Sequence, residues 1–272
     1  MHIASIFNGH QADLPVAENG LKIRTRNTHH ATRNRYMEIR YTPIPQQRSI
    51  WAYIIAAANA LFFLGAFVVG QETALVLGAK INQAIVLGQW WRLLTAVFLH
   101  ADLLHLGMNT YALIAFGPQV EQIYGRWRFL LSYLTAGLTG SAFSFLLNPY
   151  PSVGASGAIF GLIGMLGAYF YRYRHQLRSG RAALGNILFI LAYNLFYGLA
   201  NPRVDNWGHI GGLLAGLTLG WFLAPLYVVV QPDPFRPPQV MEVRSPRRWI
   251  AGLALVGGGI LLVLIAGILR WG

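Results

Sequence analysis

The sequence of this 272-residue chain contains no cysteine and few charged residues. Without cysteine there are no disulfides, no thiol nucleophile and no thiolate-ligated metal. Charged residues make up 11% of the chain, whereas soluble domains usually carry about 25%. Hydrophobic residues make up 55%, and several long stretches contain no Asp, Glu, Lys or Arg. This composition is not that of an ordinary soluble enzyme, and it leaves Ser, His, Asp, Glu and the backbone to supply any chemistry.

Seven apolar stretches follow a polar beginning, and each approaches the length that crosses a bilayer of about 30 Å. They predict helices over residues 51–70, 103–120, 129–147, 156–171, 184–200, 207–230 and 249–271. The fold class is therefore an all-α, polytopic membrane protein. Its predicted parts are a basic tail (1–50), a six-helix core (51–230), a Pro-rich linker (231–248) and an additional carboxyl-terminal transmembrane helix (249–272). The tail lacks the apolar core and cleavage site of a signal peptide.

Lys and Arg are distributed unequally between the two sides of these helices. If the helices alternate in direction, 17 of the 21 Lys and Arg fall on the side of the tail. The four on the other side are Lys80, Arg92, Arg203 and Arg270. By the positive-inside rule we expect a multi-pass protein of the cell (plasma or inner) membrane, with a cytoplasmic amino terminus and the carboxyl terminus outside. This pattern accounts for the net charge of +12 without nucleic acid as a partner.

Two segments depart from a simple series of spans. The outer connection 71–102 is still apolar and contains the pair Trp90-Trp91, so we expect it to lie at the membrane interface. The predicted helix 156–171 is only about 24 Å long at 1.5 Å per residue, which is less than the hydrocarbon thickness. A non-helical segment, 148–154, precedes it. Irregular backbone at membrane depth requires a protein-lined or wet cavity.

Few polar residues lie within the apolar spans, and two of them suggest a nucleophile and its base. Ser156 follows Gly154-Ala155 where the irregular segment becomes helix, and His209 lies near the start of the sixth span. The G-x-S-G pattern alone is weak, since a small-residue packing site gives the same signal. Both helices carry small residues at four-residue spacing, which lets helices approach closely in a bilayer. These residues are Gly157, Gly161, Gly212, Gly216 and Gly220.

No buried carboxylate is available to complete a catalytic triad. Asp205 lies four residues before His209, but its position predicts an N-cap of the sixth helix. The residues therefore favour a Ser-His dyad. His105 and Asn109 share one face of the second helix, where they can act either as oxyanion donors or as an interhelical hydrogen-bonding pair. We expect His100 to be a solvated loop residue and Asp102 to cap the second helix.

The order of these motifs along the chain resembles the rhomboid family of intramembrane serine proteases. The matching motifs are Trp91-Arg92, His100, His105-x-x-x-Asn109, Glu121, Gly154-Ala155-Ser156-Gly157 and His209-x-x-Gly212-x-x-x-Gly216. They extend over residues 51–230. The seventh helix is similar to that of the family's six-plus-one variant, so the resemblance implies a rhomboid-type bundle.

The resemblance also implies the roles of individual residues. Ser156 would be the nucleophile and His209 its base. His105, Asn109 and Gly154, with the Ser156 amide, would form the oxyanion hole. Phe160 stands where the family often has a stacking Tyr, and Gly212 belongs to the close-packed face; both would support the site. No metal and no cofactor are implied.

The function implied is an endopeptidase that cuts other membrane proteins in or near their transmembrane segments, with the lipid bilayer as its surroundings. A catalytically silent rhomboid-like binding or extraction factor is the alternative, although such members typically lack the Ser or the His. A solute transporter is disfavoured because no internal repeat is visible. A metalloprotease is disfavoured because the chain has no His-Glu-x-x-His motif.

Overall fold

The computed structural model describes residues 48–175, 177, 180–225, 227–230, 239–242 and 246–272. The predicted tail lies almost wholly outside these residues. The described residues form ten helices and one two-stranded sheet. The helices are α1 (Trp51–Val69), α2 (Gln71–Gly78), α3 (Asn82–Val86), α4 (Arg92–Thr95), α5 (Leu103–Tyr124), α6 (Arg126–Leu147), α7 (Ser156–Arg172), α8 (Gly180–Ala200), α9 (Asn206–Leu223) and α10 (Pro246–Trp271).

All seven predicted helices are present, as α1 and α5 to α10, so the all-α membrane fold is confirmed. The predicted sixth helix was too long: α9 ends at Leu223 rather than at residue 230. Pro225 follows two residues later and disfavours helix at Ala224. The next apolar residues, Tyr227–Val230, are aromatic and β-branched, and they form strand β1.

Strand β1 pairs antiparallel with β2 (Gln239–Glu242), with Tyr227 opposite Glu242 and Val230 opposite Gln239. The segment predicted as a linker therefore contains a strand. Residues 231–238 between the strands lie outside the described residues. The hairpin belongs to a compact unit separate from the helical bundle. Helix α10 begins three residues earlier than predicted and belongs to the bundle.

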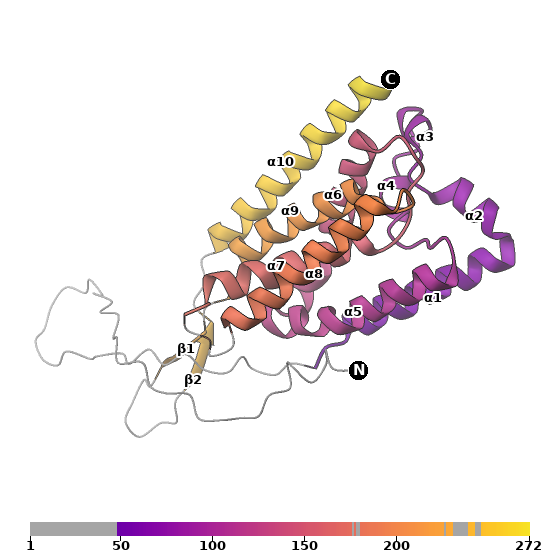
Figure 1. The fold of residues 1–272 in the computed structure, drawn as a ribbon. Helices are drawn as coiled ribbons and strands as arrows, with labels where there is room; N and C mark the ends of the chain where they lie inside the picture. The colour runs from indigo at the N-terminus through magenta and orange to yellow at the C-terminus, as the bar shows by residue number, and fades with distance from the viewer. Residues whose placement is uncertain (1–47, 176, 178–179, 226, 231–238, 243–245) are drawn as a thin grey trace, which may run out of the picture. The chain divides into compact units, whose positions relative to one another are not determined.

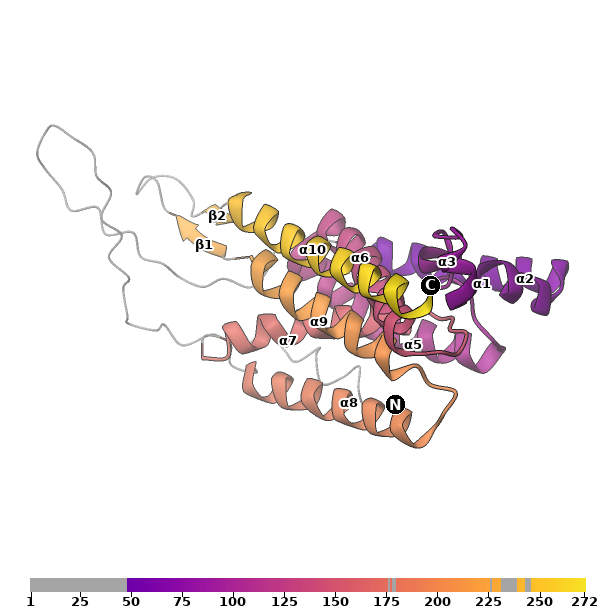
Figure 2. The same ribbon diagram turned by 90° about the horizontal axis from the view of Figure 1, so that it is seen from above.

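The centre of the bundle is formed by α6, α7 and α9, which pack against one another (Figures 1 and 2). Helix α8 lies against α7, and α10 lies along α6 and α9. The connection 71–102, which keeps the name outer connection for its predicted side, contains the short helices α2, α3 and α4. Together these elements place the beginnings of α5, α7 and α9 at one end of the bundle, named here the site end.

Judged by length and composition alone, four of the described helices could each cross a membrane: α1, α6, α8 and α10. Helix α7 has only 17 residues, and α5 and α9 carry polar residues and glycine. In α7 most side chains are buried by neighbouring helices, so the bundle supplies the apolar surroundings that this helix needs.

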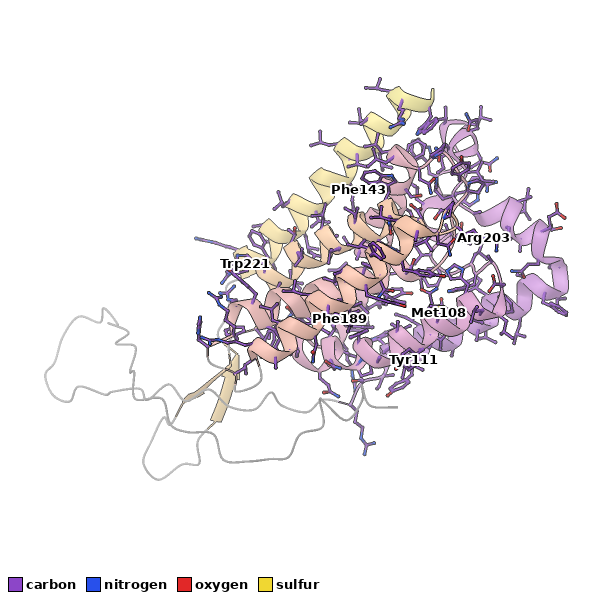
Figure 3. All side chains as sticks on the ribbon, viewed as in Figure 1. Met108, Tyr111, Phe143, Phe189, Arg203 and Trp221 are labelled. Atoms are coloured by element: carbon purple, nitrogen blue, oxygen red, sulfur yellow. The ribbon has the colours of Figure 1, made fainter. Side chains whose placement is uncertain are left out.

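Large apolar side chains cover the outside of the bundle. Met108 and Tyr111 on α5 and Phe189 on α8, labelled in Figure 3, are each more than half exposed. In a protein that spans a membrane, such side chains contact lipid tails rather than water.

The amino end of α1 is capped by a carboxylate from a different helix. Glu121, near the end of α5, is buried and accepts hydrogen bonds from the backbone N–H groups of Ile50, Trp51 and Ala52 at 2.9, 3.1 and 3.2 Å. The cap residue Ile50 has no side chain that could satisfy these donors. Glu121 therefore joins α1 to α5 at the end opposite the site end.

We expect Glu121→Gln to lower the free energy of unfolding by about 1.5–3 kcal/mol, because the charged acceptor of three N–H donors is lost. Thermal unfolding in detergent micelles measures the change. Glu72→Gln, which alters an exposed carboxylate on α2, is the control and should leave the midpoint unchanged. Equal midpoints for both variants would contradict this account of α1.

Candidate active site

Ser156 is the first residue of α7 and is half-buried. The segment 148–155 that leads to it is held by the outer connection. Ser152 and Lys80 exchange two backbone hydrogen bonds of 3.0 and 3.1 Å, and the N–H of Gly154 donates to the carbonyl of Ala96 at 2.8 Å. The irregular backbone before the serine is therefore paired with protein groups, as its depth requires.

Helices α7 and α9 approach so closely that only glycine fits between them. A Cβ atom on Gly212 would overlap the carbonyl of Gly157, and one on Gly216 would overlap the carbonyl of Gly161. The glycine spacing in the sequence predicted this packing. Gly157 in turn lies against the carbonyl of Gly208, so the residues that follow Ser156 lie beside those that precede His209.

His209 lies in the first turn of α9, is 8% exposed and stacks on Phe160. The two ring centroids are 4.2 Å apart and the planes differ by 7°. A parallel contact of this kind fixes the plane of the imidazole. Phe160, one turn after Ser156 on α7, thus supplies the stacking face predicted from the sequence.

Among the described residues, no carboxylate accepts a hydrogen bond from the ring of His209. Its Nδ1 atom is buried and has no hydrogen-bond partner there. Asp205 instead caps α9, accepting from the N–H of Gly208 at 3.1 Å, as predicted. The hydrogen bonds of the described residues include none between Ser156 and His209. Catalytic hydrogen bonds are often long without substrate and shorten only when substrate binds.

His105 and Asn109 lie at the start of α5, which Asp102 caps by accepting from the N–H of His105 at 2.8 Å, as predicted. Gly154 has a φ of +122°, and a Cβ there would come within 2.6 Å of His105 Nε2. The same point is 3.8 Å from Asn109 Nδ2. Asn109 donates one amide hydrogen to the carbonyl of His105 at 2.9 Å, which leaves its second hydrogen available. Both side chains therefore lie beside the segment that leads to Ser156.

His100 is not the solvated loop residue that the sequence predicted. It is 1% exposed, its ring lies 5.2 Å from that of His105, and its carbonyl accepts from Gln71 at 2.6 Å. Burial, with a smaller contribution from His105, lowers the pKa of His100 to about 4. His100 is therefore a neutral packing partner of His105. The prediction was wrong because the short helices of the outer connection fold over this residue.

The sequence reasoning also gave no structural role to Lys80. This residue is 1% exposed, although it lies in a connection between helices. The signal in the sequence was a single Lys that lies between two apolar runs of the connection 71–102.

Comparison with known proteins agrees with a helical membrane bundle. A family model described as "Rhomboid domain" matches residues 87–226, slightly more than half of the chain. The chain therefore belongs to the rhomboid family.

Several relatives carry the family name. "Rhomboid protease GluP" of Bacillus subtilis (strain 168) is 46% identical over 170 residues, which are 61% of this chain and 33% of that protein. "RHOMBOID-like protein 2" of Arabidopsis thaliana is 46% identical over 136 residues, 50% of this chain and 43% of its own length. "Putative rhomboid protease YdcA" of Bacillus subtilis is 34% identical over 142 residues, 52% and 70% of the two chains. This chain spans a third to a half of the length of most of the curated relatives it matches.

The contact between α7 and α9 gives a direct test of the site's framework. We expect Gly212→Ala to destabilise the protein by about 1–3 kcal/mol, because the added methyl group must push the two backbones apart. Thermal unfolding in detergent reports the loss. Gly258→Ala on α10 is the matched control, since no atom lies within 4 Å of its Cβ position. If both alanine variants unfold at the same temperature, α7 and α9 are not packed as described.

Proposed function

We propose that the protein is an intramembrane serine endopeptidase that hydrolyses peptide bonds in or near the transmembrane segments of other membrane proteins. The observation that carries the proposal is the juxtaposition of Ser156, at the start of α7, with His209 on the helix most closely packed against it. The names of the relatives GluP and YdcA support a protease.

In the proposed reaction, neutral His209 takes the proton of the Ser156 hydroxyl while the oxygen attacks a substrate carbonyl carbon. The resulting tetrahedral intermediate collapses, the C–N bond breaks, and the imidazolium gives its proton to the leaving amine. A water molecule, deprotonated by His209, then hydrolyses the acyl-enzyme and releases the second product. The stack on Phe160 holds the imidazole in one plane through these steps.

The proposed oxyanion hole is formed by the side chains of His105 and Asn109 and the backbone N–H of Ser156, beside Gly154. These groups surround the start of α7, where the free N–H groups of the helix also favour negative charge. Preorganised donors of this kind stabilise the intermediate without having to reorganise during the reaction. The left-handed backbone at Gly154 allows His105 to lie against the loop, because a Cβ there would collide with its ring.

We also propose that the site end faces outward and the tail side faces the cytoplasm. The opposite end of the bundle carries arginines stacked on tryptophans: Arg128 lies 4.6 Å from the ring of Trp249, and Arg172 lies 5.4 Å from that of Trp221. Trp is enriched at both membrane interfaces, whereas Arg is enriched on the cytoplasmic side, so the arginines favour this orientation. Substrates would then be cut near the outer ends of their transmembrane segments.

We expect Ser156→Ala and His209→Ala each to reduce proteolysis by roughly 1000-fold or more, and the double variant to lose little beyond either single one, because the two residues act as a unit. The measurement is cleavage of a model transmembrane substrate in liposomes. Cleavage by purified Ser156→Ala at the wild-type rate would refute the assignment of Ser156 as the nucleophile. No cleavage by the wild-type protein would favour a catalytically silent binding factor.

The same model substrates test which end of a transmembrane segment is cut. In a second substrate, the cleavage motif is moved from the outer to the cytoplasmic end of the segment. Helical substrates hide their carbonyls in intrahelical hydrogen bonds, so cutting should require Gly or Pro nearby. Products identified by mass spectrometry should come from the outer motif. Efficient cutting at the cytoplasmic end would contradict the orientation.

Asn109→Ala should lower kcat by about 10–1000-fold and change KM much less, because an oxyanion donor acts on the transition state. Steady-state kinetics on the liposome substrate separate the two constants. The control is Asn194→Ala. Asn194 lies on α8, and its amide likewise donates to the carbonyl four residues earlier. A rise in KM at unchanged kcat would instead indicate a role in substrate binding.

A further inference from the structure

Lys80 lies between α2 and α3 and places a cation among backbone carbonyls at the site end. Its Nζ donates to the carbonyls of Tyr150 at 2.7 Å and Asn148 at 2.9 Å and to the side-chain oxygen of Asn82 at 3.1 Å. A fourth acceptor, the carbonyl of Ser144, lies at 3.4 Å. An ammonium group has three hydrogens, so the three shorter contacts account for all of them.

These acceptors belong to the segment that leads to Ser156. Asn148 caps the end of α6, and Tyr150 lies two residues farther along. The backbone of Lys80 is bridged to Ser152 in the same segment. One residue of the outer connection thus holds three positions within the eight residues before Ser156.

A carboxylate at the start of the helix that carries His209 influences the pKa of Lys80. Asp205 caps α9, and its charge and that of Lys80 influence each other. Burial is the main influence on Lys80 and lowers its pKa to about 8, while Asp205 raises it in part. Burial alone would raise the pKa of Asp205, but nearby hydroxyl and N–H groups and Lys80 outweigh it and lower the pKa.

We infer that Lys80 is a positioning residue, which fixes the course of the segment before Ser156. This inference rests on the proposed proteolytic function. A buried ammonium group is a costly way to fill space, since replacement of buried charges by apolar side chains is often neutral or stabilising. The three directed hydrogen bonds supply what an apolar side chain cannot, a fixed course for the irregular backbone.

The test is Lys80→Met, which keeps the length of the side chain and removes its donors. We expect kcat on the liposome substrate to fall at least tenfold with KM within about twofold of wild type. The rate at which a fluorophosphonate probe labels Ser156 should fall in parallel. The thermal midpoint is measured on the same samples, so that a loss of kcat in folded protein is separated from a loss of fold.

Arg203→Met is the matched control, because it removes a cation from the same end of the protein. Arg203 is exposed, in the turn before α9 (Figure 3), and its loss should leave kcat and labelling unchanged. If folded Lys80→Met keeps the wild-type kcat and labelling rate while Ser156→Ala is inactive, the role of Lys80 is overturned and the proposed function stays intact. Activity that survives in Ser156→Ala would overturn the proposed function itself.

A pH profile keeps the inference testable if Lys80→Met does not fold. Around Nζ lie α3, the end of α6 and the segment 148–152. The charged groups nearby are Asp205, which raises the pKa of Lys80, and Arg92 on α4, which donates to the carbonyl of Ala79 beside Lys80. The labelling rate of the wild type should fall as the pH rises through about 8, since a neutral amine donates two hydrogen bonds instead of three.

The contribution of Lys80 to the free energy of unfolding would show the opposite dependence on pH. The unfolded chain keeps this proton up to its ordinary pKa of 10.5, so raising the pH from about 8 to 10 favours the folded state. The variant Asp205→Asn keeps a residue that can cap α9 and removes the charge that raises the pKa of Lys80. In this variant the labelling rate should therefore fall at a lower pH than in the wild type. A flat profile up to pH 10, or an unchanged midpoint in Asp205→Asn, would overturn the inference.

Discussion

The close approach of α7 to α9 is the constraint on which the site depends. In a bilayer there is no hydrophobic gain from burying one apolar helix against another, so helices associate through close packing of small residues. Gly157 and Gly161 face Gly212 and Gly216 with no room for a side chain between the backbones. That contact places the start of α7 beside the start of α9, and with them Ser156 beside His209. A larger residue at these positions would separate the pair, whatever happened to their own chemistry.

The rest of the site end is arranged around this contact. The outer connection holds the irregular segment before Ser156 through the backbones of Lys80 and Ala96 and through the ammonium group of Lys80. The start of α5 adds His105 and Asn109 on the other side of the same segment. Helix α10 also reaches this end, where the indole of Trp271 donates to the carbonyl of Phe145 on α6 at 2.6 Å. The backbone of the segment before Ser156 is therefore held from several elements of the bundle.

Much of the fold could be predicted from the sequence, because long uncharged stretches have few alternatives to helix in a membrane. The glycine spacing also predicted which faces of α7 and α9 meet. The end of α9 was missed because an apolar count does not separate a helix from the β-branched run after Pro225. The burial of His100 and Lys80 could not be predicted, because it depends on how α2, α3 and α4 fold over the segment before Ser156. Local sequence does not encode such long-range contacts.

The central claim is that Ser156 is a nucleophile activated by His209, and its most direct test is the site of covalent modification. The purified protein would be treated with a fluorophosphonate, digested and analysed by mass spectrometry. The account predicts a single adduct on Ser156 that disappears when His209 is replaced by alanine. An adduct on another serine, such as Ser144 or Ser152, or no adduct in folded protein, would contradict it.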